Sequence, residues 1–120
     1  MAAQTLERGT LKSTDAERSR LLRVMQRHVG ATHGIGVKAL AERVMLSERR
    51  VRRVISDLRE EGFSICGLPG TGYFIASNAE EMNACCEFLH QRAMHSLRLE
   101  AKLRRQALPD LINQLRFTEV

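Results

Sequence analysis

Two short amphipathic segments in the middle of the chain, separated by only three residues, constrain its fold more than any other feature. Residues 37–44 carry apolar side chains three and four positions apart, which predicts a helix over Val37–Val44. Ser47 is a good N-cap for a following helix over residues 48–61, and Gly62 stands where a C-cap glycine belongs. The apolar residues of the second segment repeat at i, i+3, i+4 and i+7: Val51, Val54, Ile55 and Leu58. The pattern predicts two helices with a tight connection.

The residues before this pair predict one further helix. Residues 1–13 are polar and lack apolar periodicity, so we expect a flexible arm there. Thr14 or Asp15 can cap a first helix that ends before Gly30, and the glycine-rich residues 30–36 predict a loop.

The residues after the pair predict a hairpin and then a long helix. Two short apolar runs flank a turn at residues 67–72, which is typical of a β-hairpin. Ser77 or Asn78 can cap a helix that runs to Leu108, and a last short helix is expected over residues 110–117. The predicted fold is mainly α with a small antiparallel hairpin, divided into an arm (1–13), a domain (14–76) and a C-terminal helical segment (77–120).

Composition limits the functions open to the chain. Its 120 residues are enough for one domain and an appendage, and too few for a large enzyme core. The net charge of +5 attracts polyanions, whereas five aromatic residues are few for a surface that stacks single-stranded bases. Three cysteines, two of them adjacent, do not form a disulfide framework. With no apolar signal or membrane-spanning stretch, we expect a cytoplasmic protein, in a bacterial cell or phage-infected host, associated with the nucleoid.

Arginines on the second helix of the central pair point to duplex DNA. Two helices joined this tightly make a helix-turn-helix candidate, whose second helix enters the major groove. Arginine there can donate two hydrogen bonds to guanine, and phosphates can bind at the helix starts. The expected DNA-binding residues are Lys38, Ser47, Arg49, Arg50, Arg52, Arg53, Ser56 and Thr71, with Arg52 better placed for phosphate. The alternative is a solvated surface helix, compensated by Glu48, Asp57, Glu60 and Glu61.

The stretch from Leu40 to Ala76, with LSERRVRRVISDLREEGFSI running into PGTGYFIA, resembles a known DNA-binding domain. It is similar to the N-terminal domain of the biotin ligase and biotin operon repressor family, and to related winged helix-turn-helix regulators. The resemblance implies a helix in the major groove and a wing, near Pro69–Tyr73, against the DNA backbone. Thr71 stands where such wings often carry a basic residue, and no ligase catalytic domain follows. A phage or prophage regulator is one origin consistent with this arrangement.

Enzyme, cofactor and metal signatures are missing from the sequence. It contains no phosphate-binding glycine loop, nucleophile motif or paired carboxylates, so we expect no enzyme activity and no cofactor. Cys86 and His90 share a helix face, but a structural zinc site needs four ligands, and we expect no metal.

The long C-terminal helix predicts self-association or a protein partner. Apolar residues repeat every three or four positions between Met82 and Ala107, with Glu100 as an interruption, and suggest a homodimer that binds two half-sites. A monomer with a packed helix remains the alternative. Three functions stay open: a sequence-specific transcriptional regulator, a nonenzymatic replication or assembly factor that recruits a partner, and a winged-helix protein-interaction module. The operator, any effector and the sign of regulation are not determined by the sequence.

Overall fold

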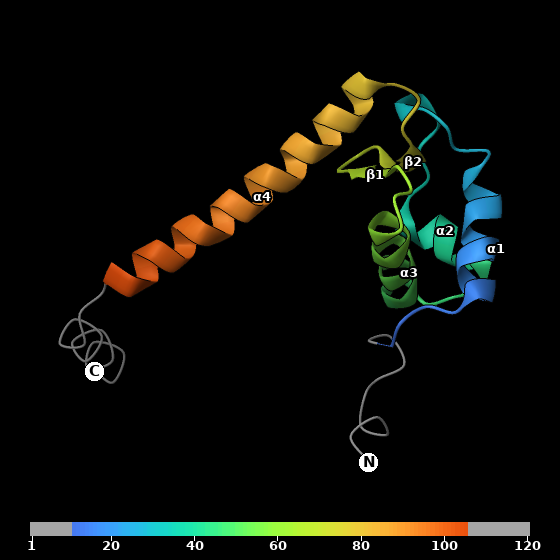
Figure 1. Cartoon of the computed structure of the whole chain (residues 1–120), viewed down its shortest axis with the longest axis horizontal. Helices are drawn as coiled ribbons and strands as arrows, with labels where there is room; N and C mark the ends of the chain where they lie inside the picture. The colour runs from blue at the N-terminus through green and yellow to red at the C-terminus, as the bar shows by residue number, and fades with distance from the viewer. Residues whose placement is uncertain (1–10, 106–120) are drawn as a thin grey trace, which may run out of the picture. The chain divides into compact units, whose positions relative to one another are not determined.

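The computed structural model describes residues 11–105 (Figure 1). In chain order its elements are α1 (Asp15–Met25), the 3-10 helix η3 (Ala31–His33), α2 (Val37–Val44), α3 (Glu48–Glu60), β1 (Ile65–Leu68), β2 (Gly72–Ile75) and α4 (Ala79–Arg105). They divide into two compact units, with the boundary between Cys85 and Cys86. This order confirms the predicted fold class, mainly helical with one small antiparallel hairpin and a long helix after it.

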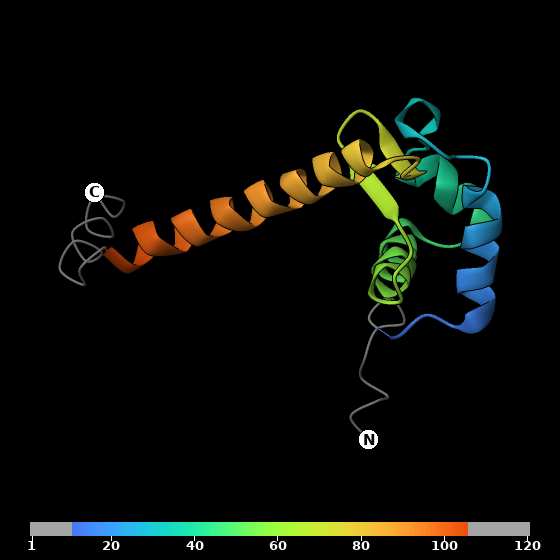
Figure 2. The same cartoon turned by 45° about the horizontal axis from the view of Figure 1, so that its top comes forward.

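The core of the first unit lies between α1, α2 and α3, and each of these helices contacts the other two. The side chains at the spacings predicted from the sequence are buried there: Leu21, Met25, Leu40, Val44, Val51, Val54, Ile55 and Leu58. Figures 1 and 2 show the three helices gathered beside the hairpin. Burying one face of each helix leaves the opposite faces in solvent.

Local signals in the sequence set the helix ends. Thr14 caps α1 in a reciprocal capping box, in which its hydroxyl accepts from the Glu17 amide and the Glu17 carboxylate accepts from the Thr14 amide. Met45 ends α2 in the left-handed conformation, with φ of 56°. The Ser47 hydroxyl accepts from the Arg50 amide at 3.1 Å, which confirms the predicted N-cap of α3. Gly62 follows α3 with φ of 99°, as the C-cap pattern predicted.

The segment between α1 and α2 differs from its prediction. The first helix ends at Met25, because the following residues pair with the hairpin: His28 and Gly30 exchange backbone hydrogen bonds with Ile75, and Ile35 does so with Tyr73. The expected loop over residues 30–36 therefore contains η3 and adds backbone pairing to β2. In the hairpin itself β1 and β2 are antiparallel, with Cys66 opposite Phe74.

The long helix α4 begins in the first unit. The Asn78 side chain accepts from the Glu81 amide, which confirms Asn78 as the predicted cap. The Glu81 carboxylate accepts from the amide and hydroxyl of Ser77 and from the Ala31 amide. Cys85 is buried in a small cluster with Cys66 and Phe74. The predicted continuation of this helix to Leu108 and the short helix over 110–117 lie outside the described residues.

Candidate nucleic-acid interface

The exposed face of α3, defined here as Arg49, Arg52, Arg53 and Ser56, lies opposite the buried face of that helix. Arg49, Arg52 and Ser56 are exposed and follow one another at intervals of three and four residues, so they share one side of the helix. Arg53 lies on the same side, with its side chain 39% exposed and its Nε 3.2 Å from a carboxylate oxygen of Asp57. Three arginines and a hydroxyl are thus presented together on a helix that is anchored by its other face.

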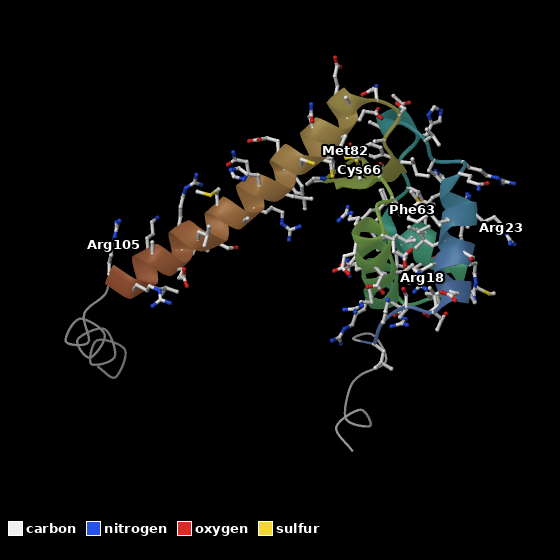
Figure 3. The ribbon with its side chains drawn as sticks, in the orientation of Figure 1. Arg18, Arg23, Phe63, Cys66, Met82 and Arg105 are labelled. Carbon is white, nitrogen blue, oxygen red and sulfur yellow. The ribbon has the colours of Figure 1, made fainter. Side chains whose placement is uncertain are left out.

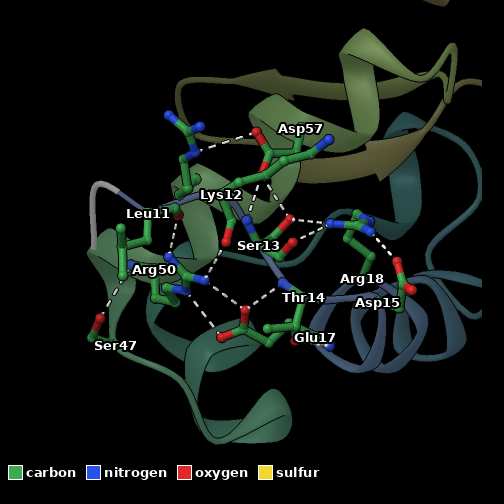
Figure 4. Close-up of polar contacts among 11 residues, drawn as sticks. Leu11, Lys12, Ser13, Thr14, Asp15, Glu17, Arg18, Ser47, Arg50 and Asp57 are labelled. Carbon is green, nitrogen blue, oxygen red and sulfur yellow. Dashed lines mark hydrogen bonds and ion pairs between the residues drawn. The ribbon is translucent and has the colours of Figure 1, made fainter. Parts of the chain in front are cut away.

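Arg50 does not belong to this face. It is only 6% exposed, and its Nε and Nη2 donate to the two carboxylate oxygens of Glu17 at 2.9 and 2.7 Å (Figure 4). The same guanidinium donates to the backbone carbonyls of Leu11, at 2.5 Å, and Lys12, at 3.0 Å. This placement corrects the expectation that Arg50 lies on the groove-facing side. Position 50 falls on the flank of α3 next to α1, where a buried guanidinium needs a carboxylate partner.

The ion pair between Arg50 and Glu17 shifts the pKa of both residues. Hydrogen bonds from the Arg50 guanidinium, supported by its charge and by Thr14, outweigh burial and lower the pKa of Glu17 from 4.5 to about 2. The carboxylate of Glu17 in turn raises the pKa of Arg50. Both groups therefore remain charged at neutral pH, inside the domain, and join α1 to the start of α3.

Residues Leu11–Thr14, here called the N-terminal strap, run along α3. The amide and hydroxyl of Ser13 donate to one carboxylate oxygen of Asp57 at 2.8 and 2.7 Å, and Arg18 donates to the Ser13 carbonyl (Figure 4). Burial raises the pKa of Asp57, but the two Ser13 hydrogen bonds and the charges of Arg53 and Lys12 more than offset it, so that the pKa is lowered. Residues 11–13, expected in a flexible arm, are held in place by these contacts.

The strap brings a basic residue to α3 that the sequence analysis did not single out. Lys12 is exposed, and its charge acts on Asp57, which lies one turn after Arg53. No spacing in the sequence links position 12 to a helix some 40 residues later. The only available signal was compositional, a lysine in a polar N-terminal segment.

The wing, defined here as β1, β2 and their turn, is fixed against the segment before α2. A Cβ added to Gly34 would lie 2.0 Å from the Thr71 carbonyl oxygen, so only glycine permits this approach. Thr71 itself is half-buried, and its amide donates to the Leu68 carbonyl at 3.1 Å. Lys38, the remaining expected contact, is exposed on the first turn of α2, and Ser47 is exposed at the start of α3.

A second group of arginines lies away from α3. A shallow hollow of about 270 Å³ between α1 and α2 is lined by Arg23, Val24, Arg27 and Arg43, and we call it the arginine hollow (Arg23 is labelled in Figure 3). Arg20, one turn before Arg23 and Val24, donates to the Val44 carbonyl at 2.7 Å. No local spacing in the sequence indicates this group, because its members come from α1, from the loop after it and from α2.

Within residues 11–105 no group of three or more histidine, cysteine or acidic side chains is arranged to hold a metal ion. Over the same residues, no helix combines the length and apolar character needed to cross a membrane.

The three helices and the hairpin packed beside them define a class of protein: the elements from α1 to β2 form a winged helix-turn-helix domain. Residues 20–74, which extend from within α1 into β2, match the family model described as HTH domain. Over these residues the chain is similar to helix-turn-helix domains, and this match supports a DNA-binding role. No curated protein and no solved structure matches the chain.

Proposed function

We propose that the protein is a sequence-specific regulator of transcription, a nonenzymatic repressor that acts by occupying a promoter. In this proposal α3 enters the major groove of double-stranded DNA, and the wing contacts the neighbouring backbone. The observation that carries it is the exposed face of α3. A buried apolar face fixes the helix to the domain, and the arginines on the opposite side are presented at the spacing of successive helical turns.

The exposed face suggests a division of roles among its members. Arg49 and Arg53 lie in the first two turns of α3, where a guanidinium can donate two hydrogen bonds to guanine O6 and N7, and Ser56 follows one turn on. Arg52 is better placed for phosphate. Lys38 and Ser47, which are exposed, and the half-buried Thr71 supply further backbone contacts, because hydroxyls, ammonium groups and helix starts all bind phosphate oxygens. Arg50 takes no part, since its donors are used inside the domain.

The proposed regulator binds DNA as a dimer that forms through α4. The helix leaves large apolar side chains in solvent, with Leu97 and Leu103 exposed by 54% and 69%. Monomeric proteins seldom leave several large apolar side chains exposed on one side of a helix, so a second copy is the proposed cover. A two-fold dimer would place two domains on an inverted repeat with half-sites about one helical turn apart.

The arginine hollow favours a second candidate function, in which the domain docks a protein partner. Three arginines surround a half-buried valine, and this combination suits an acidic segment with an apolar side chain. The protein would then be a replication or assembly factor that binds DNA and recruits a partner, or an interaction module without DNA.

The test is selection of binding sites from a random duplex library, followed by affinity measurements with two matched variants. Arg49→Ala with Arg52→Ala removes two charges from the exposed face of α3, and Arg23→Ala with Arg27→Ala removes two from the arginine hollow. We expect one enriched site, bound about a thousandfold more tightly than scrambled duplex. The α3 variant should lose about 10- to 100-fold or more in affinity for it, and the hollow variant little.

Other outcomes of this test have distinct meanings. Equal, salt-sensitive losses in both variants and no enriched site would show that the basic surface acts nonspecifically, against the proposal. Unchanged DNA binding by the α3 variant would remove α3 from the interface. A reporter gene placed behind the selected site should be repressed by the protein and released by the α3 variant.

A further inference from the structure

Leucines exposed on one side of α4, here called the leucine row, lie in the second unit. Leu89, Leu97 and Leu103 are exposed by 41%, 54% and 69%, and with Ala93 they lie on one side of the helix. Phe88 does not belong to this row, because it precedes Leu89 by one residue and so lies about 100° away around the helix; the Arg92 guanidinium lies over its ring at 5.8 Å. In residues 86–105 α4 is the only element, and a helix of this length depends on packing of its apolar side for stability.

Charge is distributed unevenly along the same helix. Its beginning carries Glu80, Glu81 and Glu87, whereas its end carries Arg98, Lys102, Arg104 and Arg105 with Glu100 as the one acidic residue. Two such helices side by side in parallel would place both basic ends together and both acidic ends together. Side by side in antiparallel orientation, each basic end lies along an acidic beginning, and the two helix dipoles are also opposed.

We propose that two copies of this chain pair through α4 in antiparallel orientation, with the two-fold axis at Ala93. This inference rests on the proposed dimer and adds its geometry. Ala93 lies four residues after Leu89 and four before Leu97. An axis at Ala93 therefore brings Leu89 of each copy against Leu97 of the other, and the small alanine side chain lets the two helices approach closely at the centre.

The orientation is tested by disulfide trapping in the full chain. Cys86→Ser removes the exposed cysteine, and Leu89→Cys with Leu97→Cys adds two thiols to that background. Within one helix positions 89 and 97 are about 12 Å apart, given a rise of 1.5 Å per residue, which is too far for a bond. In a glutathione redox buffer we expect disulfides between position 89 of one copy and position 97 of the other. Trypsin cleaves between them at Arg92, so mass spectrometry of the peptides identifies each pairing.

Two results of the trapping experiment would overturn the proposal. Disulfides that join 89 to 89 and 97 to 97 would show a parallel pair. The second result is a chain that forms no covalent dimer and sediments as a monomer at a concentration on the order of 100 µM. It would show that the leucine row is not a self-association surface.

A second measurement keeps both leucines. Glu80→Lys with Glu87→Lys makes the beginning of α4 basic, and antiparallel pairing predicts a dimer dissociation constant at least tenfold weaker at low salt. Adding Arg98→Glu and Lys102→Glu should restore it, since the basic beginning then meets an acidic end. A parallel pair would show neither effect, because the beginning would face a copy of itself. The change should shrink as salt is raised.

The same variants separate this inference from the proposed function. None of them touches α3, so their affinity for a duplex with a single half-site should equal that of the unaltered chain. A parallel or monomeric result with half-site binding intact would overturn the pairing alone. An antiparallel dimer that selects no DNA site would overturn the proposed regulator and leave the pairing in place.

Discussion

Replacing Glu17 by glutamine tests the account of Arg50 as a buried structural residue. The substitution keeps the size of the side chain and removes its charge, so that the Arg50 guanidinium, 6% exposed, loses the carboxylate that accepts two of its hydrogen bonds. We expect the domain to lose about 3 kcal/mol of unfolding free energy at pH 7. Breaking one side of a buried pair typically costs about 3–5 kcal/mol.

The magnitude follows from the pKa of Glu17. Folding lowers it from 4.5 to about 2, and at about 1.4 kcal/mol per pKa unit this difference corresponds to about 3 kcal/mol. Because the folded pKa is the lower one, the stabilisation is complete above about pH 5 and is lost as the pH falls from 4.5 toward 2. Asp57 contributes in the same direction, since its pKa is also lowered.

The assay is urea unfolding of the unaltered chain and the Glu17→Gln variant between pH 2 and pH 7. Taking the difference between the two proteins at each pH removes the contribution of Asp57, which both retain. That difference should be largest above pH 5 and nearly vanish at pH 2. Glu42→Gln, at an exposed position on α2, is the matched control and should change little. A difference below about 1 kcal/mol at pH 7, or one that does not vary with pH, would refute the reasoning.

Three further predictions concern the same domain. Glu17→Leu combined with Arg50→Met replaces the ion pair by apolar groups. The free energy of unfolding should stay within about 2 kcal/mol of that of the unaltered chain, and affinity for the selected DNA site should not change. A folded variant that loses this affinity would place Arg50 in the DNA interface after all. Gly34→Ala places a methyl group against the Thr71 carbonyl of the wing and should lower the free energy of unfolding in urea by about 3 kcal/mol. In the control Gly36→Ala, the added methyl group meets nothing within 4 Å, and the loss should be under about 1 kcal/mol. Equal losses in the two variants would argue against the close approach at Gly34. Thr14→Ala removes the cap of α1 and should lower the thermal midpoint by an amount equivalent to about 1 kcal/mol; no change in the midpoint would show that the capping box contributes nothing.

Periodicity and capping predicted most of the fold because they act between residues close together in the chain. Val51, Val54 and Leu58 repeat at helical spacing, and all three are buried. Ser47 was identified by a preference that depends only on the next three residues, and it caps α3 as expected. The same reasoning failed at residues 26–35, because pairing with β2 ends α1 early, and a partner strand some 40 residues away leaves no mark on local spacing.

The candidate site was predicted less completely, for the same reason. Helical spacing distinguishes the buried face of α3 from its other faces. It does not predict which of those other faces is covered by α1 or by the N-terminal strap. Arg50 and Arg53 both lie off the buried face in sequence; α1 and the N-terminal strap cover only Arg50. Glu17, the residue that decides this outcome, is separated from Arg50 by 33 positions.

The number of arginines on α3 therefore overstates the positive charge that this helix offers to DNA in the proposed interface. One of five, Arg50, is neutralised inside the domain, and Arg59 donates from Nε to the Ile65 carbonyl beside the hairpin. Arg53 shares its charge with Asp57. Arg52 lies 3.9 Å from a carboxylate oxygen of Glu48, at the protein surface. Exposure is therefore the better guide to the proposed base contacts, and substitutions at the exposed Arg49 should relax sequence preference more than those at the less exposed Arg53.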